Sequence, residues 1–521
     1  MAISVTATGE GFSTGIIKLG ELELSQVSSF TKVWATHEGG PDNLGATFFQ
    51  PSMPAGFSVL GCYCQPNNKP LFGWVLAGKD AGNALAKPVD YKLVWSSKSA
   101  KMKQDGYGYI WLPMPPQGYA PVGYMVTSSS SKPSLDQIRC VRSDLTDACE
   151  DDRLVWSTSG GVNVYGSRPS TRGTQAPGVA VGTFMVHVDG DTSTPSISCL
   201  KNKDFILSHM PNLPQIDSLL QAYSPWVYFH PDEVYLPCSL TWLFNNGALL
   251  YKQGDPAPAP AAIDPNGSNL PQGGSNDGAY WVDLPVDEGA RDRAKRGDIE
   301  SAESYIHVKP MLGGTFTDIQ IWVFFPFNGP SRAKVQLVNI PLGKTGEHVG
   351  DWEHLTLRVS NFNGELWRVY FSQHSGGKWV DASELEFEGG NKAVGYASLH
   401  GHAFYPKAGL VLQGNESLGI GIRNDTAKGK VRCDTGERSV LVAVEHLSDS
   451  VVGPAWLGYT RKWGPKISYD LADEMQKIAE VLPGNLKDAF EKVIDGIPRE
   501  VFGEEGPTGP NMKRSWNGDE I

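Results

Sequence analysis

The second half of the chain contains a strand signal in Gly346-Glu347-His348-Val349-Gly350-Asp351-Trp352-Glu353-His354, which runs on into Leu355, Leu357 and Val359. Side chains alternate between the two faces of a strand, so Asp351 and Glu353 are predicted to share a face with these apolar residues. The stretch therefore predicts a strand with an inward apolar stripe and two acids at its entry end.

The same stretch contains a candidate metal site. His348 stands just before the turn glycine and can fold over the end of the strand where Asp351 and Glu353 lie. An imidazole and two carboxylates suit a hard divalent cation such as Ca or Mg. Acids at a strand start also occur at the rim of a β-sandwich without any ligand, and this alternative stays open. Three further candidate ligand-binding residues follow in the sequence: His374, His400 and His402.

The composition is that of a folded globular protein. At 521 residues, with 40% hydrophobic and 20% charged residues, the chain is long enough for about two to four domains. The net charge of −12 argues against nucleic acid as a partner. No block of Lys and Arg indicates electrostatic binding to anionic lipid, so membrane binding would depend on head-group recognition or apolar contact.

Neither a signal peptide nor a transmembrane helix is predicted. Residues 1–10 have no basic start and no apolar core, and the most apolar run, residues 319–327, is too short to cross a bilayer as a helix. The seven cysteines are scattered and odd in number, which is typical of reduced thiols. We expect a cytoplasmic protein that can associate peripherally with membranes.

An internal repeat organises the first part of the chain. Trp34, Trp95 and Trp156 lie in similar short motifs with a period of 61 residues, and segments rich in Gly and Pro recur with the same period. Three such units of short apolar runs predict a β-prism over residues 30–205, closed about a pseudo-threefold axis. The three tryptophans either pack along this axis as core or line exposed pockets as ligand-binding residues.

The second half is predicted to be a β-sandwich of the jelly-roll kind, with helical insertions and a helical C-terminal tail, so the whole chain is expected to be mainly β. Lys334–Ile340 is one of the strands predicted in it. The predicted segments are 1–29 as an N-terminal segment, 30–205 as a prism of three repeats, 206–223 as a helical linker, 224–465 as the sandwich with a long loop at 253–278 and a helical insertion at 286–304, 466–502 as amphipathic helices, and 503–521 as a polar tail. The tail is expected to be disordered unless other parts of the chain bind it.

Four motifs carry a resemblance to a known family. They are Ser224-Pro225-Trp226-Val227-Tyr228-Phe229-His230-Pro231-Asp232-Glu233, Gly346 to His354, Ser372-Gln373-His374-Ser375-Gly376-Gly377 and Leu399-His400-Gly401-His402-Ala403-Phe404-Tyr405-Pro406. Through these motifs nearly the whole chain resembles the plant proteins named as vacuolar protein sorting-associated protein 62 homologues. The resemblance implies a shared architecture and, by its name, a role in vacuolar sorting.

A second similarity concerns the candidate metal site. His348, Asp351 and Glu353 have the same spacing as the first histidine, the aspartate and the glutamate in the GHRHDWE motif of the necrosis- and ethylene-inducing peptide-like cytolysins. This resemblance implies a β-sandwich that uses a divalent cation to bind sphingolipid head-group sugars. The family takes a further aspartate from an upstream YFPKD-like segment. The similar segment here, residues 324–328, implies Asn328 as the fourth ligand.

Three functions are compatible with the sequence. The first is a non-enzymatic protein that binds membrane glycolipid or glycan head groups, as a defence-type insecticidal or cytolytic, pore-forming toxin able to assemble into homo-oligomers on membranes. The second is an intracellular trafficking scaffold, as the family name implies. The third is a metal-dependent hydrolase, in which the ion activates water. Against the third, the sequence contains no G-x-S-x-G, H-E-x-x-H or phosphate-loop motif.

Overall fold

The computed structural model describes residues 11–158, 161–190, 197–374, 376–480, 482–497, 502 and 506–520. It confirms that the chain is mainly β, with few helices. Among the described residues, no helix is both long enough and apolar enough to span a bilayer. The chain divides into unit 1, with residues 1–215, 310–317 and 359–365, and unit 2, with residues 216–309, 318–358 and 366–521. Two turns from the second half therefore belong to the first unit, in addition to the residues predicted for the prism.

Three similar sheets of unit 1 each contain one repeated tryptophan in their first strand. Their strands are β3 (Phe30–Ala35), β4 (Ala46–Pro51) and β6 (Tyr63–Pro66); β9 (Asp90–Ser96), β10 (Tyr109–Met114) and β12 (Met125–Thr127); and β15 (Cys149–Ser157), β16 (Val162–Pro169) and β18 (Phe184–Val188). In each sheet the middle strand pairs antiparallel with the other two. This threefold repetition of one antiparallel unit is the arrangement that the 61-residue period predicts.

Three further sheets complete unit 1. They are β1 (Ile17–Leu19), β2 (Leu22–Val27), β7 (Val75–Asp80) and β5 (Ser58–Val59); β11 (Tyr119–Ala120), β13 (Cys140–Arg142) and β8 (Leu85–Ala86); and β14 (Thr146–Asp147), β19 (Cys199–Lys201) and β17 (Gly178–Val179). The backbone of the turn at residues 359–365 belongs to this unit because Asn361 and Phe362 accept hydrogen bonds from its first described residues.

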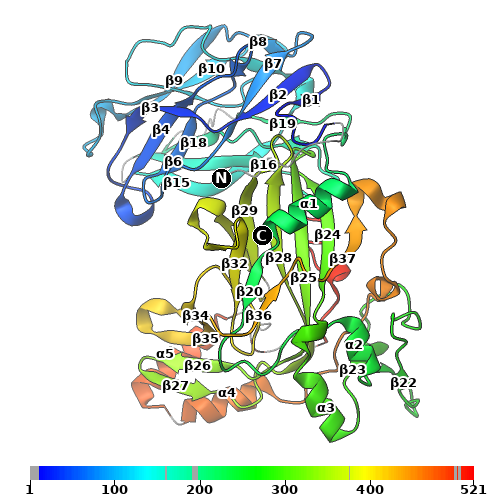
Figure 1. Ribbon diagram of the computed structural model, residues 1–521. Helices are drawn as coiled ribbons and strands as arrows, with labels where there is room; N and C mark the ends of the chain where they lie inside the picture. Colours follow the sequence, from blue (N-terminus) through cyan, green and yellow to red (C-terminus); the bar gives the residue numbers. More distant parts are fainter. Residues whose placement is uncertain are drawn as a thin grey trace. The chain divides into compact units, whose positions relative to one another are not determined.

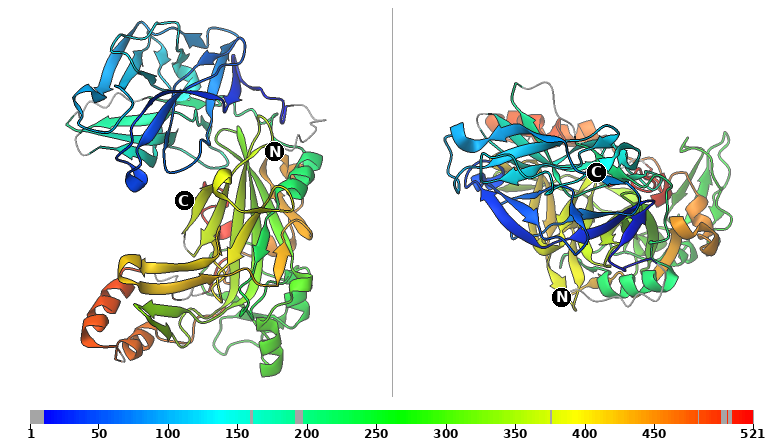
Figure 2. Two further views of the ribbon diagram at one scale, coloured as in Figure 1. Left: turned by 60° about the vertical axis from the view of Figure 1, so that its left-hand side comes forward. Right: turned by 90° about the horizontal axis from the view of Figure 1, so that it is seen from above.

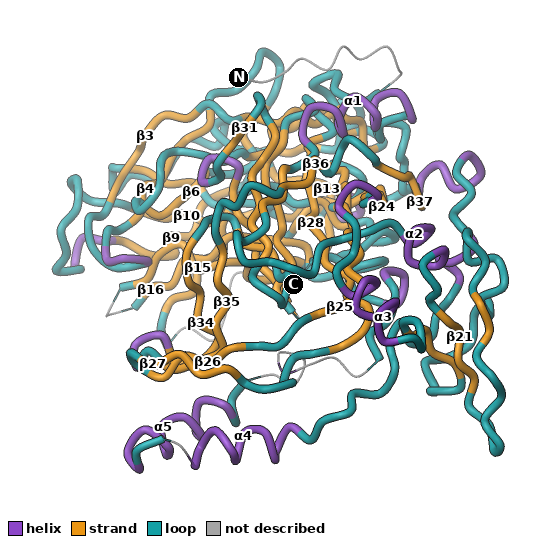
Figure 3. The backbone as a smooth tube through the Cα atoms, turned by 60° about the horizontal axis from the view of Figure 1, so that its bottom comes forward, coloured by secondary structure: helices purple, strands orange, loops and turns teal. Residues whose placement is uncertain are grey.

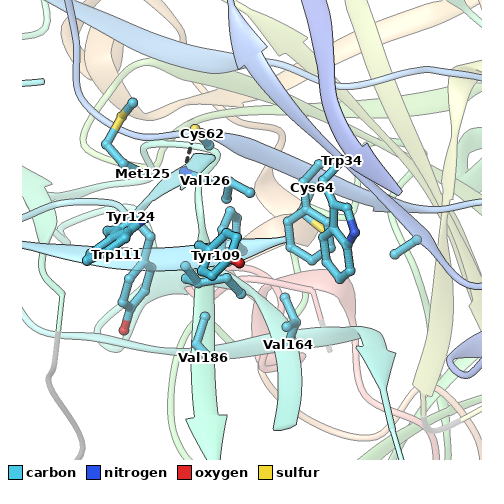
Figure 4. Packing of buried hydrophobic residues seen from close by; sticks show 14 of the residues in the cluster. Trp34, Cys62, Cys64, Tyr109, Trp111, Tyr124, Met125, Val126, Val164 and Val186 are labelled. Atoms are coloured by element: carbon cyan, nitrogen blue, oxygen red, sulfur yellow. Dashed lines mark hydrogen bonds between the residues drawn. The ribbon is translucent and has the colours of Figure 1, made fainter. Parts of the chain in front are cut away.

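The repeated tryptophans meet in the core of unit 1. The ring centroid of Trp156 lies 5.8 Å from that of Trp34 and 5.6 Å from that of Trp95. Trp34 and Trp156 are fully buried, and Trp95 is partly buried against the same cluster. Figure 4 shows Trp34 near Cys64 in this cluster, to which Tyr109 also belongs. This burial favours core packing of the tryptophans over exposed ligand pockets.

Two larger sheets form the body of unit 2 (Figure 1). The first has the order β30 (Gly376–Asp381), β29 (Leu366–Gln373), β28 (His348–Ser360), β25 (Phe316–Asn328), β24 (Ser304–Met311) and β37 (Ser439–Val444). The second has the order β31 (Phe387–Glu388), β32 (Lys392–Ala397), β20 (Trp226–Tyr228) and β36 (Arg432–Asp434), and β33 (Phe404–Tyr405) pairs with β32. Phe229, just after β20, packs edge-on against Phe325 of β25 at 6.2 Å between ring centroids. The two sheets therefore pack against each other as a sandwich.

Both faces of strand β28 are buried. The predicted apolar stripe is fully buried and consists of Leu355, Leu357 and Val359. The residues that alternate with it are polar, yet at most 7% exposed: His354, Thr356 and Arg358. A strand with a polar face usually leaves that face in water, so another part of the chain must cover it here.

A smaller four-stranded sheet and two helices lie side by side in unit 2 (Figures 2 and 3). They are β27 (Val338–Pro341), β26 (Arg332–Val335), β35 (Ile420–Thr426) and β34 (Gly409–Asn415), with α4 (Leu471–Glu480) and α5 (Gly484–Ile494). Phe490 and Ile494 of α5 belong to one apolar cluster with Ile422 of β35. The predicted single strand Lys334–Ile340 is wrong, because the chain turns back at Gln336, which has a positive φ of 55°.

The remaining elements of unit 2 are peripheral. They include α1 (Leu213–Tyr223), which begins in unit 1, α2 (Leu240–Asn245), α3 (Glu288–Lys295) and the sheet of β22 (Ala261–Ala262), β21 (Leu249–Lys252) and β23 (Tyr280–Asp283). Helix α3 lies inside the predicted helical insertion, and the Asp287 carboxylate caps it by accepting a hydrogen bond from the amide of Ala290.

Candidate functional site

A cavity of about 520 Å³ lies at the end of β28 in unit 2. Five of the predicted site residues line it: Asn328, His348, Asp351, Glu353 and His374. They come from the end of β25, the first half of β28 and the turn just after β29, which lie close together because these strands are neighbours in one sheet. The fold thus brings together residues that the sequence placed in three separate motifs.

Asp351 is a buried carboxylate at this cavity, with 8% of its surface exposed. Its Oδ2 atom accepts a hydrogen bond from Nδ1 of His402 at 3.0 Å. Burial alone would raise the pKa of Asp351, but the hydrogen bond from His402 and the charges of His348, His402 and Lys513 outweigh burial and lower it. The carboxylate is therefore held in its charged form, which a cation site requires.

Glu353 and His348 complete the predicted acid and imidazole set. Glu353 is 5% exposed, and its Oε2 atom accepts a hydrogen bond from the Ser372 hydroxyl. His348 is partly buried, and its Nδ1 atom donates to the backbone oxygen of Gly350 at 2.9 Å. With Nδ1 occupied in this way, Nε2 is the ring atom of His348 that a cation can use.

Asn328 lines the same cavity through a different arrangement. Its amide nitrogen donates to the backbone oxygens of Gly346 at 2.7 Å and Gly329 at 3.1 Å. The amide oxygen is not used in these bonds and is the atom that could bind a cation. The donor set of two carboxylates, an imidazole and an amide oxygen fits a hard divalent cation in its chemistry.

The donor atoms are of the right chemical kind, but they do not converge on one point. Within the described part of the chain, no three His, Cys, Asp or Glu side chains converge closely enough to hold a metal ion. Cation binding at Asp351 and Glu353 therefore requires side chains in the cavity to rearrange. Lys513 and Arg514 line the same cavity, so positive charge is already present there.

The other predicted histidines have separate partners. The Nε2 atom of His374 donates to the amide oxygen of Asn424 at 3.0 Å, and burial lowers the pKa of His374. His402 is fully buried and its ring stacks on Phe325 at 3.9 Å between centroids, outside the cavity lining. His402 therefore positions Asp351 and does not itself face the cavity.

His400 forms a distinct pair that the sequence did not indicate. Its backbone amide donates to Oε2 of Glu233 at 2.6 Å, and its ring lies 3.2 Å from Oε1 of the same carboxylate. Glu233 belongs to the first family motif, at the start of unit 2. This pair ties two of the four motifs together, but neither residue lines the cavity. Trp34, Trp95 and Trp156 are core residues of unit 1 and take no part in this cavity.

The polar face of β28 is covered by segment 506–520, which also forms one wall of the cavity. The Glu520 carboxylate accepts a hydrogen bond from the Thr356 hydroxyl at 2.7 Å and lies 3.2 Å from Nε2 of His354. Asp519 accepts from the Arg358 guanidinium at 2.6 Å. Other parts of the chain therefore bind the described residues of this tail, and this is the case in which the sequence does not predict disorder.

The sequence of the whole chain decides its family. It matches the family model described as vacuolar protein sorting-associated protein 62 over residues 1–520. The chain belongs to this family. No curated protein matches the chain. Membership of the vacuolar protein sorting-associated protein 62 family agrees with the resemblance seen in the four motifs.

Several solved structures are similar to parts of this chain, and two of them are described as a toxin fold. The crystal structure of GNIP1Aa from Chromobacterium piscinae is 21% identical over 38% of this chain and 40% of that chain, with a TM-score of 0.27. NLPPya in complex with glucosamine is 15% identical over 36% of this chain and 67% of that chain, with a TM-score of 0.22. Necrosis and Ethylene inducing Protein 2, from the causal agent of cocoa's Witches Broom disease, is 11% identical over 54% of this chain and 90% of that chain, with a TM-score of 0.20.

The match to GNIP1Aa spans less than half of that protein's length. TM-scores of this size do not establish a shared fold. The function of this member of the family is therefore argued from the residues of its own cavity.

Proposed function

We propose that this protein is a non-enzymatic binding protein that recognises glycan or glycolipid head groups at membranes through a divalent cation, Ca or Mg. The cation would be held by His348, Asp351, Glu353 and Asn328. The observation that carries the proposal is that these four residues, from two different strands, line one cavity of about 520 Å³. A cation there would polarise sugar hydroxyls and orient them against the polar wall.

The burial of two carboxylates favours a ligand site over a purely structural rim of the sandwich. Asp351 and Glu353 are both at most 8% exposed. A rim carboxylate would stay in water, whereas burying a charge costs free energy unless the charge is paired. His402 holds the carboxylate of Asp351 in place and Ser372 holds that of Glu353, and Asp351 and Glu353 still line the cavity.

A second feature supports binding at a membrane surface. The hairpin β26–β27 lies in the sequence between Asn328 and His348. Its tip is apolar and exposed, with Leu337 96% exposed and Val338 53% exposed. Gly419 accepts a hydrogen bond from the amide of Gln336 at 2.8 Å, which brings Leu418, 51% exposed, next to this tip. Exposed apolar side chains gathered at the end of a hairpin suit insertion among lipid acyl chains.

We expect Asp351→Ala to weaken divalent-ion binding about tenfold or more, because the variant removes one charged ligand. Isothermal titration with Ca²⁺ and Mg²⁺ measures this change. Glu384→Gln is the matched control, since Glu384 is exposed and does not line the cavity. Equal affinity in the wild type and in Asp351→Ala would show that the ion does not bind at this cavity.

The membrane part of the proposal has its own test. Leu337→Asp should weaken binding to vesicles of plant or insect gut lipids about tenfold or more, because burying one leucine side chain contributes about 1.5–3 kcal/mol. Vesicle co-sedimentation measures the binding. Val286→Asp is the control, since Val286 is 71% exposed but lies away from the hairpin in the sequence. Equal loss in both variants would point to a general charge effect and against a specific tip.

Dye leakage from the same vesicles separates the finer interpretations. Leakage that a chelator abolishes supports a pore-forming, defence-type toxin that depends on the ion and assembles on the membrane. The family description favours a second candidate, a vacuolar-sorting or trafficking scaffold. A scaffold would bind no lipid head group, cause no leakage and tolerate both the chelator and Asp351→Ala.

A further inference from the structure

The cavity has an acidic end, and a chain cation faces it. Asp351 and Glu353 supply the negative charge, and Lys513 lines the same cavity. The positive charge of Lys513 contributes to the lowered pKa of Asp351. An ammonium group on a flexible stem can neutralise a carboxylate where a metal ion would otherwise do so.

The covered face of the large sheet carries Lys309 on β24 and Arg358 on β28, and residues 519 and 520 meet these cations with carboxylates. The Glu520 side chain is 1% exposed and lies 3.8 Å from the ammonium of Lys309, which is itself fully buried. Asp519 accepts from Arg358, which is also paired with the buried carboxylate of Asp318 at 2.8 Å. Lys513 therefore faces the carboxylates of the cavity, and Asp519 and Glu520 face the cations of the sheet. In both places the segment carries the charge opposite to that of the surface it covers.

We infer that residues 513–520 are an internal occupant of the cavity, in which the Lys513 ammonium takes the place of the divalent cation, so that the seated segment and the bound ion exclude one another. This inference rests on the proposed function, because it names what regulates the same site. It also accounts for the observation that no three His, Cys, Asp or Glu side chains of the described residues converge as metal ligands while residues 513–520 line the cavity.

The contacts under the segment allow it to shift. Apart from one residue, the groups that hold residues 513–520 are polar: Lys309 donates to the backbone oxygens of Ser515 and Gly518, and Gln320 donates to Glu520 at 2.8 Å. Displacing the segment exchanges these contacts for hydrogen bonds to water, and binding of the ion must supply the free energy that the buried charge pairs lose. The exception is Trp516, which stacks on His307 at 3.8 Å between centroids and belongs to the apolar core of unit 2. We therefore expect a local, reversible displacement around this tryptophan.

The first test measures ion affinity in the full chain. Lys513→Met removes the charge and keeps most of the side-chain stem. We expect its affinity for Ca²⁺, measured by isothermal titration, to rise about tenfold over the wild type, since an ion no longer has to displace a cation. Lys344→Met is the control, because Lys344 is exposed, close to His348 in the sequence, and does not line the cavity. Equal affinities of Lys513→Met and the wild type, in proteins that bind Ca²⁺, overturn the inference.

The second test follows the segment itself by hydrogen exchange. Saturating Ca²⁺ should increase amide exchange in residues 513–520 of the wild type at least several-fold, while the strands of unit 2 stay protected. The double variant Asp519→Asn with Glu520→Gln should show the same increase without Ca²⁺, because the segment has lost its charged anchors. Exchange that Ca²⁺ leaves unchanged in a protein that binds it overturns the inference.

Failure of the proposed function gives a different pattern. If neither the wild type nor any variant binds Ca²⁺, the ion site is wrong, and exchange in the double variant still decides whether the segment can shift. Selective opening of residues 513–520 then supports a displaceable internal occupant. Unchanged protection of these residues in the double variant overturns it.

Discussion

Glu520→Gln is expected to lower the free energy of unfolding of unit 2 by about 3 kcal/mol at pH 7, and this loss should shrink as the pH falls toward 2. Burial by itself would raise the pKa of Glu520 above 4.5. The charges of His354 and Lys309 and the hydrogen bond from Thr356 outweigh burial and lower the pKa to about 2. The carboxylate is therefore far more favourable in the folded chain than in water.

The direction of the pH dependence follows from proton binding. Between pH 4.5 and about 2 the unfolded chain binds a proton at Glu520 that the folded chain does not bind. Stability from this group is therefore complete above pH 4.5 and is lost as the pH falls through this window. The glutamine side chain does not titrate in this pH range, so the wild type and the variant should become similar in stability near pH 2.

Urea denaturation, monitored by hydrogen exchange of unit 2 peptides, measures how the stability of the wild type and of Glu520→Gln depends on pH. Glu474→Gln is the control, because Glu474 pairs with Lys477 at 2.9 Å on the surface of α4, with the Lys477 side chain 67% exposed. An exposed pair contributes at most about 1 kcal/mol. A loss in Glu520→Gln that is the same at pH 7 and pH 2.5 would mean that packing, and not charge, holds the segment.

Much of the fold could be predicted because its signals are local or periodic. The three tryptophans at a 61-residue period indicated three repeated units, and each tryptophan lies in the first strand of one three-stranded sheet. The alternation through Leu355 and Leu357 indicated the buried stripe of β28. Periodicity works in both cases because burial acts on every second residue of a strand.

The hairpin and the covered polar face could not be predicted for physical reasons. Residues 334–340 contain neither Gly nor Pro, so nothing local marks the turn at Gln336. Arg358 and Thr356 are polar at positions that normally face water, and the carboxylates of the tail that bind them lie about 160 residues further along the chain. Pairing of charges over such distances leaves no pattern in a single sequence.

The candidate site was predicted in part for the same reason. His348, Asp351 and Glu353 stand close together in the sequence, and strand geometry alone brings two of them to one end. His402 and Ser372, which hold the two carboxylates, lie on other segments. The position of Lys513 at the cavity could not be predicted either, because only the fold brings residue 513 to the end of β28.

Trp156→Ala is expected to lower the free energy of unfolding of unit 1 by about 3–5 kcal/mol, as usual when a large buried aromatic side chain is removed. Trp156 is fully buried and its ring lies edge-on to Trp34 at 5.8 Å and to Phe48 at 6.0 Å between centroids. Its indole nitrogen donates to the backbone oxygen of Glu38 at 3.0 Å. The variant would leave a cavity where the three repeats meet and an acceptor without its donor.

Urea denaturation followed by hydrogen exchange of unit 1 peptides measures the loss, with Tyr107→Ala as the control, since Tyr107 is 49% exposed. The same variant decides between the two roles of the repeated tryptophans. A core residue should change stability and leave any saccharide titration of the folded protein unaltered. A stable Trp156→Ala protein that had lost saccharide binding would contradict the core role and return the tryptophans to the ligand-binding residues. The burial of Trp156 makes the first outcome the expected one, because a saccharide cannot reach a ring that is enclosed by its own repeats.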